Sequence, residues 1–470
     1  MIPPTLSRRE MLKQVSCGFG TLAWSGMAQQ QAMAAQALAT QKPLVTPRAK
    51  RVIFIFMQGG PSQVDSFDYK PELMKSDGKG YDFVGVRFNT FGEKSERKLM
   101  KPLWNFKQHG SCGQWVSELF PEIGKHVDDL CFIHSMHTEG VAHGPSTLFL
   151  HTGATNLVRP SMGSWISYGL GTENANVPGF ISISPADSKG GPRNYANAFL
   201  PAIHQGTTIG AAGQPAAEAR FQNIINDRLP RAEQQRQFEL LQRLNRAQVK
   251  QAQVSDDLEA MIESYELAWR MQSHAPGLTD ISGETSSTRA MYGIGDKRTD
   301  DFGRQCLLAR RFAEEGVRFI QVNYSDESPT PRWDQHSNMP KHMDHAYATD
   351  KPVAGLLADL KARGLLEDTL VWWGGEFGRT PFSQNNNGRD HNPRGFTVWL
   401  AGGGVKPGHT HGATDALGDT AVHDRVHMHD LHATILYQLG LDHEQLTYNH
   451  AGRDFRLTDV HGRVVHEILV

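Results

Sequence analysis

The 470-residue sequence is poor in cysteine and has no excess of charge of either sign. Its four cysteines are Cys17, Cys112, Cys131 and Cys306, and none of them forms a C-x-x-C pair. A disulfide-stapled small fold is therefore excluded, and neither a cysteine zinc site nor a redox pair is indicated. A disulfide between Cys112 and Cys131 remains open. The formal net charge of −2 provides no whole-chain field that favours nucleic acid or an anionic membrane.

Long apolar runs and several well-known catalytic motifs are also missing. The weakly apolar stretch at residues 17–28 is too short to span a bilayer as a helix, so no stable membrane span is expected. The sequence contains no P-loop, no G-x-S-x-G elbow and no H-E-x-x-H motif. Histidine, by contrast, occurs 22 times. Because histidine is the commonest metal ligand, this number favours the presence of a metal site.

The first 34 residues predict an export signal. Arg8 and Arg9 precede the weakly apolar stretch, and Ala32-Met33-Ala34 offers a small-x-small cleavage site. This pattern is typical of a twin-arginine signal. We therefore expect a periplasmic or extracytoplasmic protein whose residues 35–47 form a linker. A basic amphipathic start to an ordinary domain is the alternative.

Five apolar runs predict buried strands, and helical patterns lie between them. The runs are residues 52–57, 129–135, 317–322, 369–373 and 396–400, and the helical patterns include 304–315, 344–363 and 428–439. Strands that alternate with helices predict an α/β fold over residues 48–470, with three layers, helix–sheet–helix, and a mostly parallel sheet.

Residues 215–290 predict a mainly helical insertion. They are rich in Gln, Arg, Glu and Ala, and apolar residues recur near helical spacing at Ile224, Leu229, Phe238, Leu241, Leu244 and Leu258. We interpret this segment as two or three surface helices packed on the core. The many Gln and Arg residues of this segment are interpreted as a helical face exposed to solvent. The alternative is that they form a helix that binds a partner.

Imidazoles and carboxylates stand at the ends of the predicted strands. His143 follows the second strand, Asp334 and His336 follow the third, Glu376 follows the fourth, and His391 precedes the fifth. In open α/β sheets, ligands bind beyond the carboxyl ends of the strands. We therefore predict that Asp334, His336, Glu376 and His391 hold one divalent metal ion. Mixed nitrogen and oxygen donors favour Zn²⁺ or Mn²⁺, and Ca²⁺ or Mg²⁺ remain open.

Two arginines lie in the same loops. Arg379 and Arg389 can each present two donors to a sulfate, phosphate or carboxylate. We predict that both bind substrate and that Arg379 also steadies the anion during catalysis. Capping and loop salt bridges are the alternative. The later histidines are interpreted mostly as structural, with one of them able to join the site: His409, His411, His423, His427, His429 and His432.

Six stretches together resemble a known family. They are residues 59–68 (GGPSQVDSFD), 333–336 (WDQH), 376–381 (EFGRTP), 388–393 (GRDHNP), 401–408 (AGGGVKPG) and 430–440 (DLHATILYQLG). The set resembles the DUF1501 family of exported bacterial proteins, which is related to sulfatases within the alkaline-phosphatase superfamily. The resemblance covers about residues 48–460 and implies an alkaline-phosphatase/sulfatase-like fold. The family itself has no settled activity.

The resemblance also shows where this chain departs from sulfatases. The sulfatase nucleophile motif C/S-x-P-S-R corresponds to residues 143–147 (HGPST), so His143 stands in place of Cys or Ser. Gln58 replaces an aspartate, and Glu376-Phe377 replaces a paired Asp-His. Asp334, His336 and His391 match the other half of the usual two-metal site. The resemblance therefore implies that one ion site is kept and one is lost.

Two functions remain open from the sequence. One is a hydrolase in which a metal-bound water attacks a sulfate or phosphate ester while His143 moves the proton; Ser146 and Ser62 are alternative nucleophiles. The other is a catalytically inactive protein of the same fold that binds a sulfated glycan or a surface partner. An anionic small molecule or glycan ester is the expected ligand of the hydrolase. The sequence does not determine the oligomeric state.

Overall fold

The computed structural model describes residues 45–80 and 97–470, apart from residues 223, 225, 227, 252–255 and 386. The chain divides into two units, residues 1–46 and 47–470, and every element described below belongs to the second. The predicted export signal and most of the predicted linker therefore lie outside the described residues.

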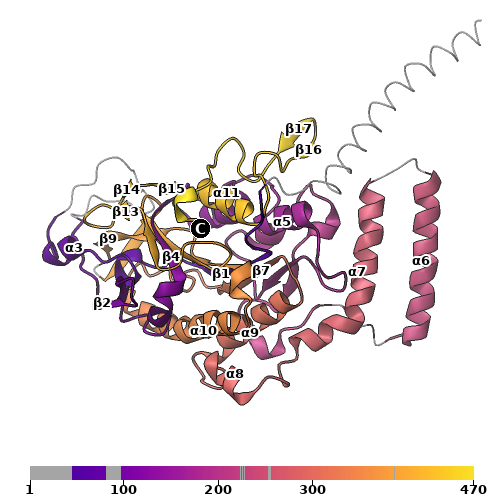
Figure 1. Cartoon of the computed structure of the whole chain (residues 1–470), viewed down its shortest axis with the longest axis horizontal. Coiled ribbons are helices and arrows are strands. Elements are labelled where there is room, and N and C mark those ends of the chain that lie inside the picture. Colours follow the sequence, from indigo (N-terminus) through magenta and orange to yellow (C-terminus); the bar gives the residue numbers. More distant parts are fainter. Residues whose placement is uncertain are drawn as a thin grey trace, which may run out of the picture. The chain divides into compact units, whose positions relative to one another are not determined.

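A single large sheet forms the centre of the second unit (Figure 1). Its nine strands, within the described residues, are β1 (Arg51–Met57), β4 (Leu130–His137), β5 (Phe180–Ile183), β6 (Thr207–Ile209), β7 (Phe319–Tyr324), β8 (Thr369–Gly374), β11 (Phe396–Ala401), β12 (His409–His411) and β15 (Val426–His427). They follow the order β12-β4-β11-β8-β1-β7-β5-β6, and β15 also pairs with β4.

The five predicted strands correspond to β1, β4, β7, β8 and β11. Strand β1 is buried at all seven positions, as expected for a parallel strand covered on both faces. It pairs in parallel with β7 and β8. Only β11, among the strands of the described sheet, runs antiparallel to its neighbours, β4 and β8. The prediction of a mostly parallel sheet is therefore confirmed.

Helices cover both faces of this sheet. One face carries α4 (His143–Thr152), α5 (Met162–Leu170) and α11 (Met428–Gln438), and the other carries α9 (Asp300–Glu314) and α10 (His342–Ala362). Alternate residues of β1 divide between the two cores: Val52, Phe54 and Phe56 face the first set, and Ile53, Ile55 and Met57 face the second. Three layers, helix–sheet–helix, result, as predicted.

The segment predicted as a helical insertion contains α6 (Arg231–Gln251), α7 (Asp256–Thr279) and α8 (Ser286–Met291). Helix α7 packs against the short helix η3 (Ala202–His204) and against α9, and α6 packs against α7 (Figure 1). Of the apolar residues at helical spacing in this segment, Leu241 and Leu244 are exposed. These two helices, α6 and α7, are called the helical hairpin below.

Smaller elements surround the sheet. Four two-stranded sheets lie in the described part of the chain: β2 (Phe106–His109) with β3 (Gln114–Ser117), β9 (Gly378–Gln384) with β10 (Gly388–Asn392), β13 (Ala413–Thr414) with β14 (Ala421–His423), and β16 (Tyr448–His450) with β17 (Arg453–Phe455). Two short helices, α2 (Gln63–Ser66) and α3 (Pro71–Lys75), follow β1. The β9–β10 pair matters most, because it carries three of the predicted site residues.

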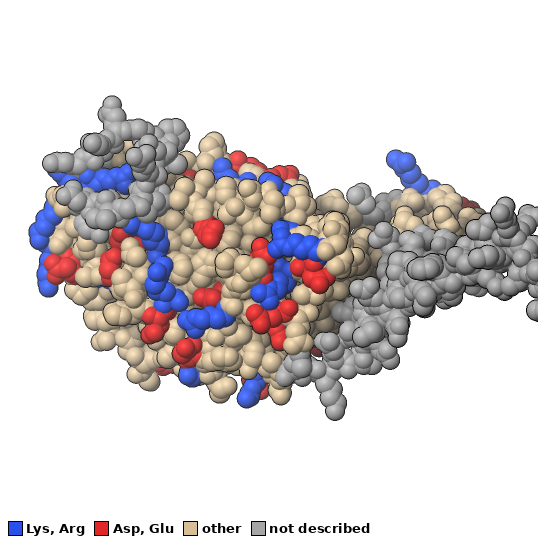
Figure 2. Space-filling view, turned by 90° about the horizontal axis from the view of Figure 1, so that it is seen from above, with Lys and Arg blue, Asp and Glu red and all other residues tan. Residues whose placement is uncertain are grey.

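Cys112, Cys131 and Cys306 are free, so Cys112 and Cys131 do not form a disulfide. Each helix of the described residues is too short or too polar to cross a membrane. Figure 2 shows basic and acidic side chains interspersed on the displayed face of the molecule.

Candidate metal centre

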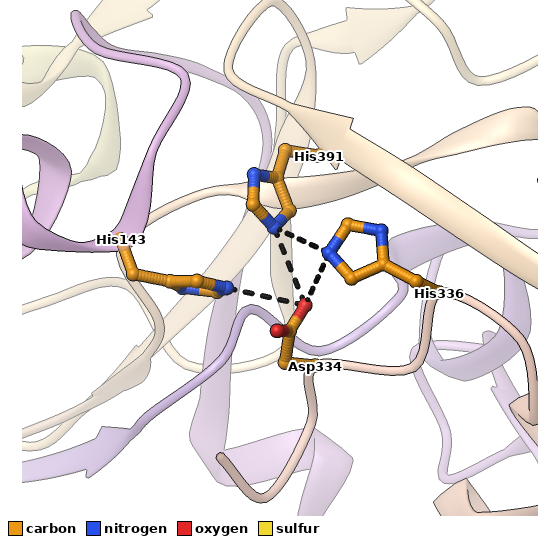
Figure 3. A group of neighbouring side chains, drawn as sticks. All are labelled: His143, Asp334, His336 and His391. Carbon is orange, nitrogen blue, oxygen red and sulfur yellow. Dashed lines mark hydrogen bonds and ion pairs between the residues drawn. The ribbon is translucent and has the colours of Figure 1, made fainter. Parts of the chain in front are cut away.

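Four side chains from three separate parts of the chain meet at one point (Figure 3). His143, Asp334, His336 and His391 each offer one ligand atom, and these four atoms lie within 4.8 Å of one another. No other group of three or more such residues is found in the part of the chain that the structure describes. The structure thus brings together three of the four predicted ligands, Asp334, His336 and His391, and adds His143 to them.

Local structure places each of the four. His143 is the first residue of α4. Asp334 and His336 lie in the segment between β7 and α10, which the fully buried Trp333 anchors in the core. His391 lies in β10, directly opposite Arg379 of β9.

Two glycines allow these segments to approach closely. Gly59 follows β1 with φ of +102°, and a Cβ there would lie 2.3 Å from the Pro331 carbonyl oxygen. At Gly388, a Cβ would lie 1.9 Å from the carbonyl carbon of His336. A side chain at either position would push the segment carrying Asp334 and His336 away. The two glycines therefore belong to the construction of the site.

The carboxylate of Asp334 forms the centre of the group. Its Oδ1 atom lies 2.8 Å from Nε2 of His336, 3.1 Å from Nε2 of His143 and 3.3 Å from Nε2 of His391. The Nε2 atoms of His336 and His391 are 3.0 Å apart. All three imidazoles thus turn the same ring atom toward one oxygen, as Figure 3 shows.

The opposite ring nitrogen of each imidazole has an oxygen partner. Nδ1 of His143 lies 2.5 Å from Oε1 of Glu376, and Nδ1 of His391 lies 2.6 Å from the Val141 carbonyl. Nδ1 of His336 contacts Oε1 of Gln384. Because these oxygens accept hydrogen bonds, Nδ1 carries the proton and Nε2 presents a lone pair. Partners of this kind fix the ring orientation of metal-ligating histidines.

This electron-rich centre fits a divalent cation. Three Nε2 atoms face one carboxylate oxygen, and the buried Nε2 of His143 contacts only that oxygen, Oδ1 of Asp334, over 3.1 Å. Ligand atoms about 2.1 Å from a tetrahedral Zn²⁺ would lie roughly 3.4 Å apart. Here the three Nε2 atoms lie 2.8–3.3 Å from Oδ1 of Asp334, and all four ligand atoms lie within 4.8 Å of one another. Without an ion, a proton supplies the positive charge. Burial lowers the pKa of His143, but hydrogen bonds to Asp334 and Glu376 outweigh it and leave that pKa raised.

Arg379 holds Asp334 and is not free to bind a substrate. Burial raises the pKa of Asp334, but Arg379 and the three histidines outweigh burial and hold that pKa well below its usual range. Nη2 of Arg379 donates to Oδ1 of Asp334 over 2.7 Å and also to the carbonyl of Gly59. Its Nε donates to Gly60 over 3.0 Å and its Nη1 to the Arg389 carbonyl over 3.2 Å. The side chain has no exposed surface, so the predicted anion-binding role is revised to positioning.

Arg389 is likewise a structural residue. Its Nε donates to Oδ2 of Asp65 over 2.7 Å, and neither side chain has exposed surface. The remaining donors serve the carbonyls of Thr380, Met100 and Lys101. An external anion therefore has no access to this guanidinium, and the predicted role of Arg389 in substrate binding is replaced by the capping and ion-pair alternative.

Glu376 was predicted to be a metal ligand, but it lies behind the metal group, and His143 is the fourth member of that group instead. Both carboxylate oxygens of Glu376 accept the Gly59 N–H, at 3.0 and 3.2 Å, while Oε1 holds His143. Phe377 packs its ring 4.4 Å from that of His391 and 5.0 Å from that of His143. Glu376 and Phe377 therefore support the four residues of the metal group from behind.

A family model described as "Protein of unknown function (DUF1501)" matches residues 49–469. The chain belongs to this family. No curated protein matches the sequence, so the DUF1501 assignment rests on the family model and on the motifs quoted above.

Solved structures similar to this DUF1501 protein include sulfatases and alkaline phosphatases. The PsFucS1 sulfatase from Pseudoalteromonas sp. is 13% identical at a TM-score of 0.34, covering 88% of this chain and 70% of that one. Ps i-CgsB in complex with k-i-k-neocarrahexaose is 12% identical at 0.36, covering 83% and 72%. Alkaline phosphatase from the Antarctic bacterium TAB5 is 12% identical at 0.31, covering 78% and 94%.

The sequence missed the partners behind the ligands. Val141 contributes a backbone carbonyl, which no side-chain pattern reveals, and Gln384 is the last residue of β9 and belongs to no distinguishing motif. The later histidines are not part of the metal group. His427, for example, caps α11 by accepting the His429 N–H, and His432 bonds the Leu150 carbonyl over 2.8 Å.

Proposed function

We propose that this DUF1501 protein hydrolyses sulfate or phosphate esters with the help of one divalent ion held by His143, Asp334, His336 and His391. The observation that carries the proposal is the convergence of three Nε2 atoms on Asp334 Oδ1, with every Nδ1 held from behind. An ion bound there would lower the pKa of a water molecule and polarise an ester oxygen.

The chain's own residues orient the ligands and control access. Glu376 keeps His143 in the tautomer that presents Nε2, and Arg379 keeps Asp334 charged and directed at the centre. The side chain of His336 is 26% exposed, whereas those of His143, Asp334 and His391 are at most 8% exposed. Substrate therefore approaches past His336. His143 serves as a ligand in this proposal, which replaces its predicted role as a proton carrier.

Metal content is the first test. Elemental analysis of the purified full chain should find about one divalent ion per molecule. The double variant Asp334→Ala/His336→Ala should bind none, and His423→Ala, which removes an exposed imidazole elsewhere, should bind as the wild type does. A wild-type protein without stoichiometric metal, or a double variant with unchanged metal, would refute the site.

Turnover is the second test. Aryl sulfates, phosphomonoesters and phosphodiesters are offered to protein loaded with Zn²⁺ or Mn²⁺. Activity with at least one class is expected, and it should disappear in the double variant while His423→Ala retains it. Metal binding with no turnover of any ester would reject hydrolysis without rejecting the metal centre.

Binding without turnover is the second candidate function, and one observation favours it. Of the two alternative nucleophiles, Ser62 donates its hydroxyl to Asp65 over 2.5 Å, and the hydroxyl of Ser146 is fully buried without a partner. Neither hydroxyl is available for attack on an ester. A sulfated glycan that binds the metal-loaded protein and is released by EDTA, while no ester is cleaved, would establish this alternative.

Export by the twin-arginine route is also proposed, on the pattern of residues 1–34. Cell fractionation should find the full chain outside the cytoplasm, and Arg8→Lys/Arg9→Lys should retain it inside. An unchanged distribution of this variant would contradict the proposal.

A further inference from the structure

Helix α6 turns leucines to the solvent. Leu240 is 51% exposed, Leu241 40% and Leu244 59%. At 100° per residue, Leu240, Leu244 and Ala247 lie on one face, opposite the side that contacts α7. An amphipathic helix normally buries such a stripe. The exposed leucines of α6 therefore form an apolar face with no covering element among the described residues.

The opposite face of α6 buries polar side chains instead. Gln242 is 5% and Asn245 7% exposed. Nε2 of Gln242 donates to the Ile262 carbonyl over 3.3 Å, but its Oε1 has no partner, and neither does Nδ2 of Asn245. Unpaired buried amide groups cost free energy. The distribution of polar and apolar residues in α6 is thus inverted relative to a helix that packs on one side only.

Specific contacts keep α6 in this orientation against α7. The rings of Phe238 and Trp269 stack 5.1 Å apart at an interplanar angle of 7°, and Arg246 pairs with Glu266 over 2.8 Å. Rotating α6 to bury its leucines would break both contacts. The leucine face therefore stays exposed, on the side of α6 opposite its contact with α7.

We infer that a second copy of this chain covers the leucine face of α6, with the two α6 helices antiparallel about a two-fold axis. In that pairing, Leu240 of one copy lies against Leu244 of the other. Charge supports a second copy as the occupant, because Glu239 and Arg243 flank the leucines on the same edge of the helix. Neither forms an ion pair with the described residues of its own chain, and the two-fold axis places each beside the other in the second copy.

The size of the surface sets the strength of this dimer. A helix of 21 residues is about 30 Å long, and one pair of such helices buries no more than the lower end of the area typical of specific interfaces, about 1,200 Å² in total. We therefore expect reversible association with a dissociation constant on the order of 10 µM. The inference does not depend on the proposed activity.

Sedimentation velocity of the full chain tests the dimer. Between about 1 and 100 µM, the wild type should shift from monomer to dimer, and Leu240→Asp/Leu244→Asp should remain monomeric. The matched control is Leu157→Asp/Val158→Asp, which changes two equally exposed apolar residues outside the hairpin and should dimerise normally. A wild type that stays monomeric throughout, or a dimer that the leucine variant leaves intact, overturns the inference.

Charge reversal gives an independent readout that does not depend on the leucines. Glu239→Arg alone and Arg243→Glu alone should each weaken self-association at least tenfold, because like charges then meet across the axis. An equimolar mixture of the two single variants should form heterodimers, which native mass spectrometry resolves by mass. Failure of the mixture to associate would overturn the antiparallel arrangement.

Discussion

The metal centre and the helical hairpin treat buried polar groups in opposite ways. At the centre, the buried side chains of Glu376, Arg379 and Arg389 form hydrogen bonds with defined partners. In the hairpin, Gln242 and Asn245 are buried with unpaired atoms while leucines face the solvent. We have proposed a cation as the missing component of the first region and a second protein surface as that of the other.

This difference concerns what the fold must preserve. Satisfied buried networks hold side chains in a single arrangement, and their loss is costly because each partner is left unpaired in a medium of low dielectric. Helix α6, whose polar side chains are buried and whose leucines are exposed, makes few buried hydrogen bonds with the rest of its own chain. The metal centre should therefore be intolerant of substitution and the hairpin tolerant, apart from effects on association.

The largest contrast is expected between two ion pairs. Arg389→Met removes one partner of the fully buried pair with Asp65 and should lower the free energy of unfolding by about 3–5 kcal/mol, because a buried carboxylate is left uncompensated. Arg246→Met breaks the exposed pair with Glu266 and should change it by less than about 1 kcal/mol. Denaturant unfolding at low protein concentration measures both. If the two variants lost similar amounts of unfolding free energy, the metal centre and the helical hairpin would not differ in their tolerance of substitution.

Two glutamines should respond with opposite sign to the same substitution. Gln63 donates to the carbonyls of Arg379 and Gly418, over 2.7 and 2.8 Å, and accepts the Arg379 N–H over 2.8 Å. Gln63→Met should therefore destabilise the protein by about 2 kcal/mol or more. Gln242→Met removes an unpaired buried oxygen together with only one long hydrogen bond, 3.3 Å to the Ile262 carbonyl. It should leave stability unchanged or raise it by up to about 1 kcal/mol. Thermal unfolding midpoints suffice for the comparison, and a destabilised Gln242→Met would contradict it.

The sheet could be predicted from the sequence because its central strands are continuous apolar runs. Residues 52–57 of β1 are all apolar and all buried, as a strand covered on both faces requires. The antiparallel direction of β11 could not be predicted, since its apolar run looks the same in either direction and only the β9–β10 connection reverses the chain.

Site residues were predictable where position alone decides the role. Asp334, His336 and His391 were found because they flank strand ends that share one edge of the sheet. Whether a neighbouring polar residue faces the ion or stands behind a ligand depends on sub-ångström packing, such as the approach of Gly59 to the Pro331 carbonyl. For this reason the sequence assigned Glu376 as a ligand and Arg379 and Arg389 to substrate. The leucines of α6 show a related limit of sequence patterns, because helical spacing identifies an apolar face but not what covers it.

Removing the carboxylate behind His143 tests whether the surrounding network controls the centre. Glu376→Gln keeps the size of the side chain but weakens the hold on Nδ1 of His143, and metal affinity should fall about 10- to 100-fold. Competition with a chelator of known affinity measures this change. The control Glu367→Gln alters an exposed carboxylate and should leave affinity unchanged. An unaltered affinity in Glu376→Gln would show that the ligands orient themselves.

The smallest expected effect is on the pH dependence of stability and comes from His432. Unlike His143, whose pKa is raised by two carboxylates, His432 is buried without a carboxylate partner. His432 is fully buried, and burial lowers its pKa to about 4 although the Leu150 carbonyl opposes the change. In the unfolded chain His432 binds a proton near pH 6.5, whereas in the folded protein it does so only near pH 4. The contribution of His432 to the free energy of unfolding is therefore complete above pH 6.5 and is lost as the pH falls toward 4. Between pH 6.5 and 5.5 this one group should remove about 1 kcal/mol. His432→Gln keeps a donor for the Leu150 carbonyl but does not titrate, so its free energy of unfolding should decline less steeply by that amount over the same interval. Parallel pH profiles for the variant and the wild type would mean that His432 contributes nothing to acid sensitivity.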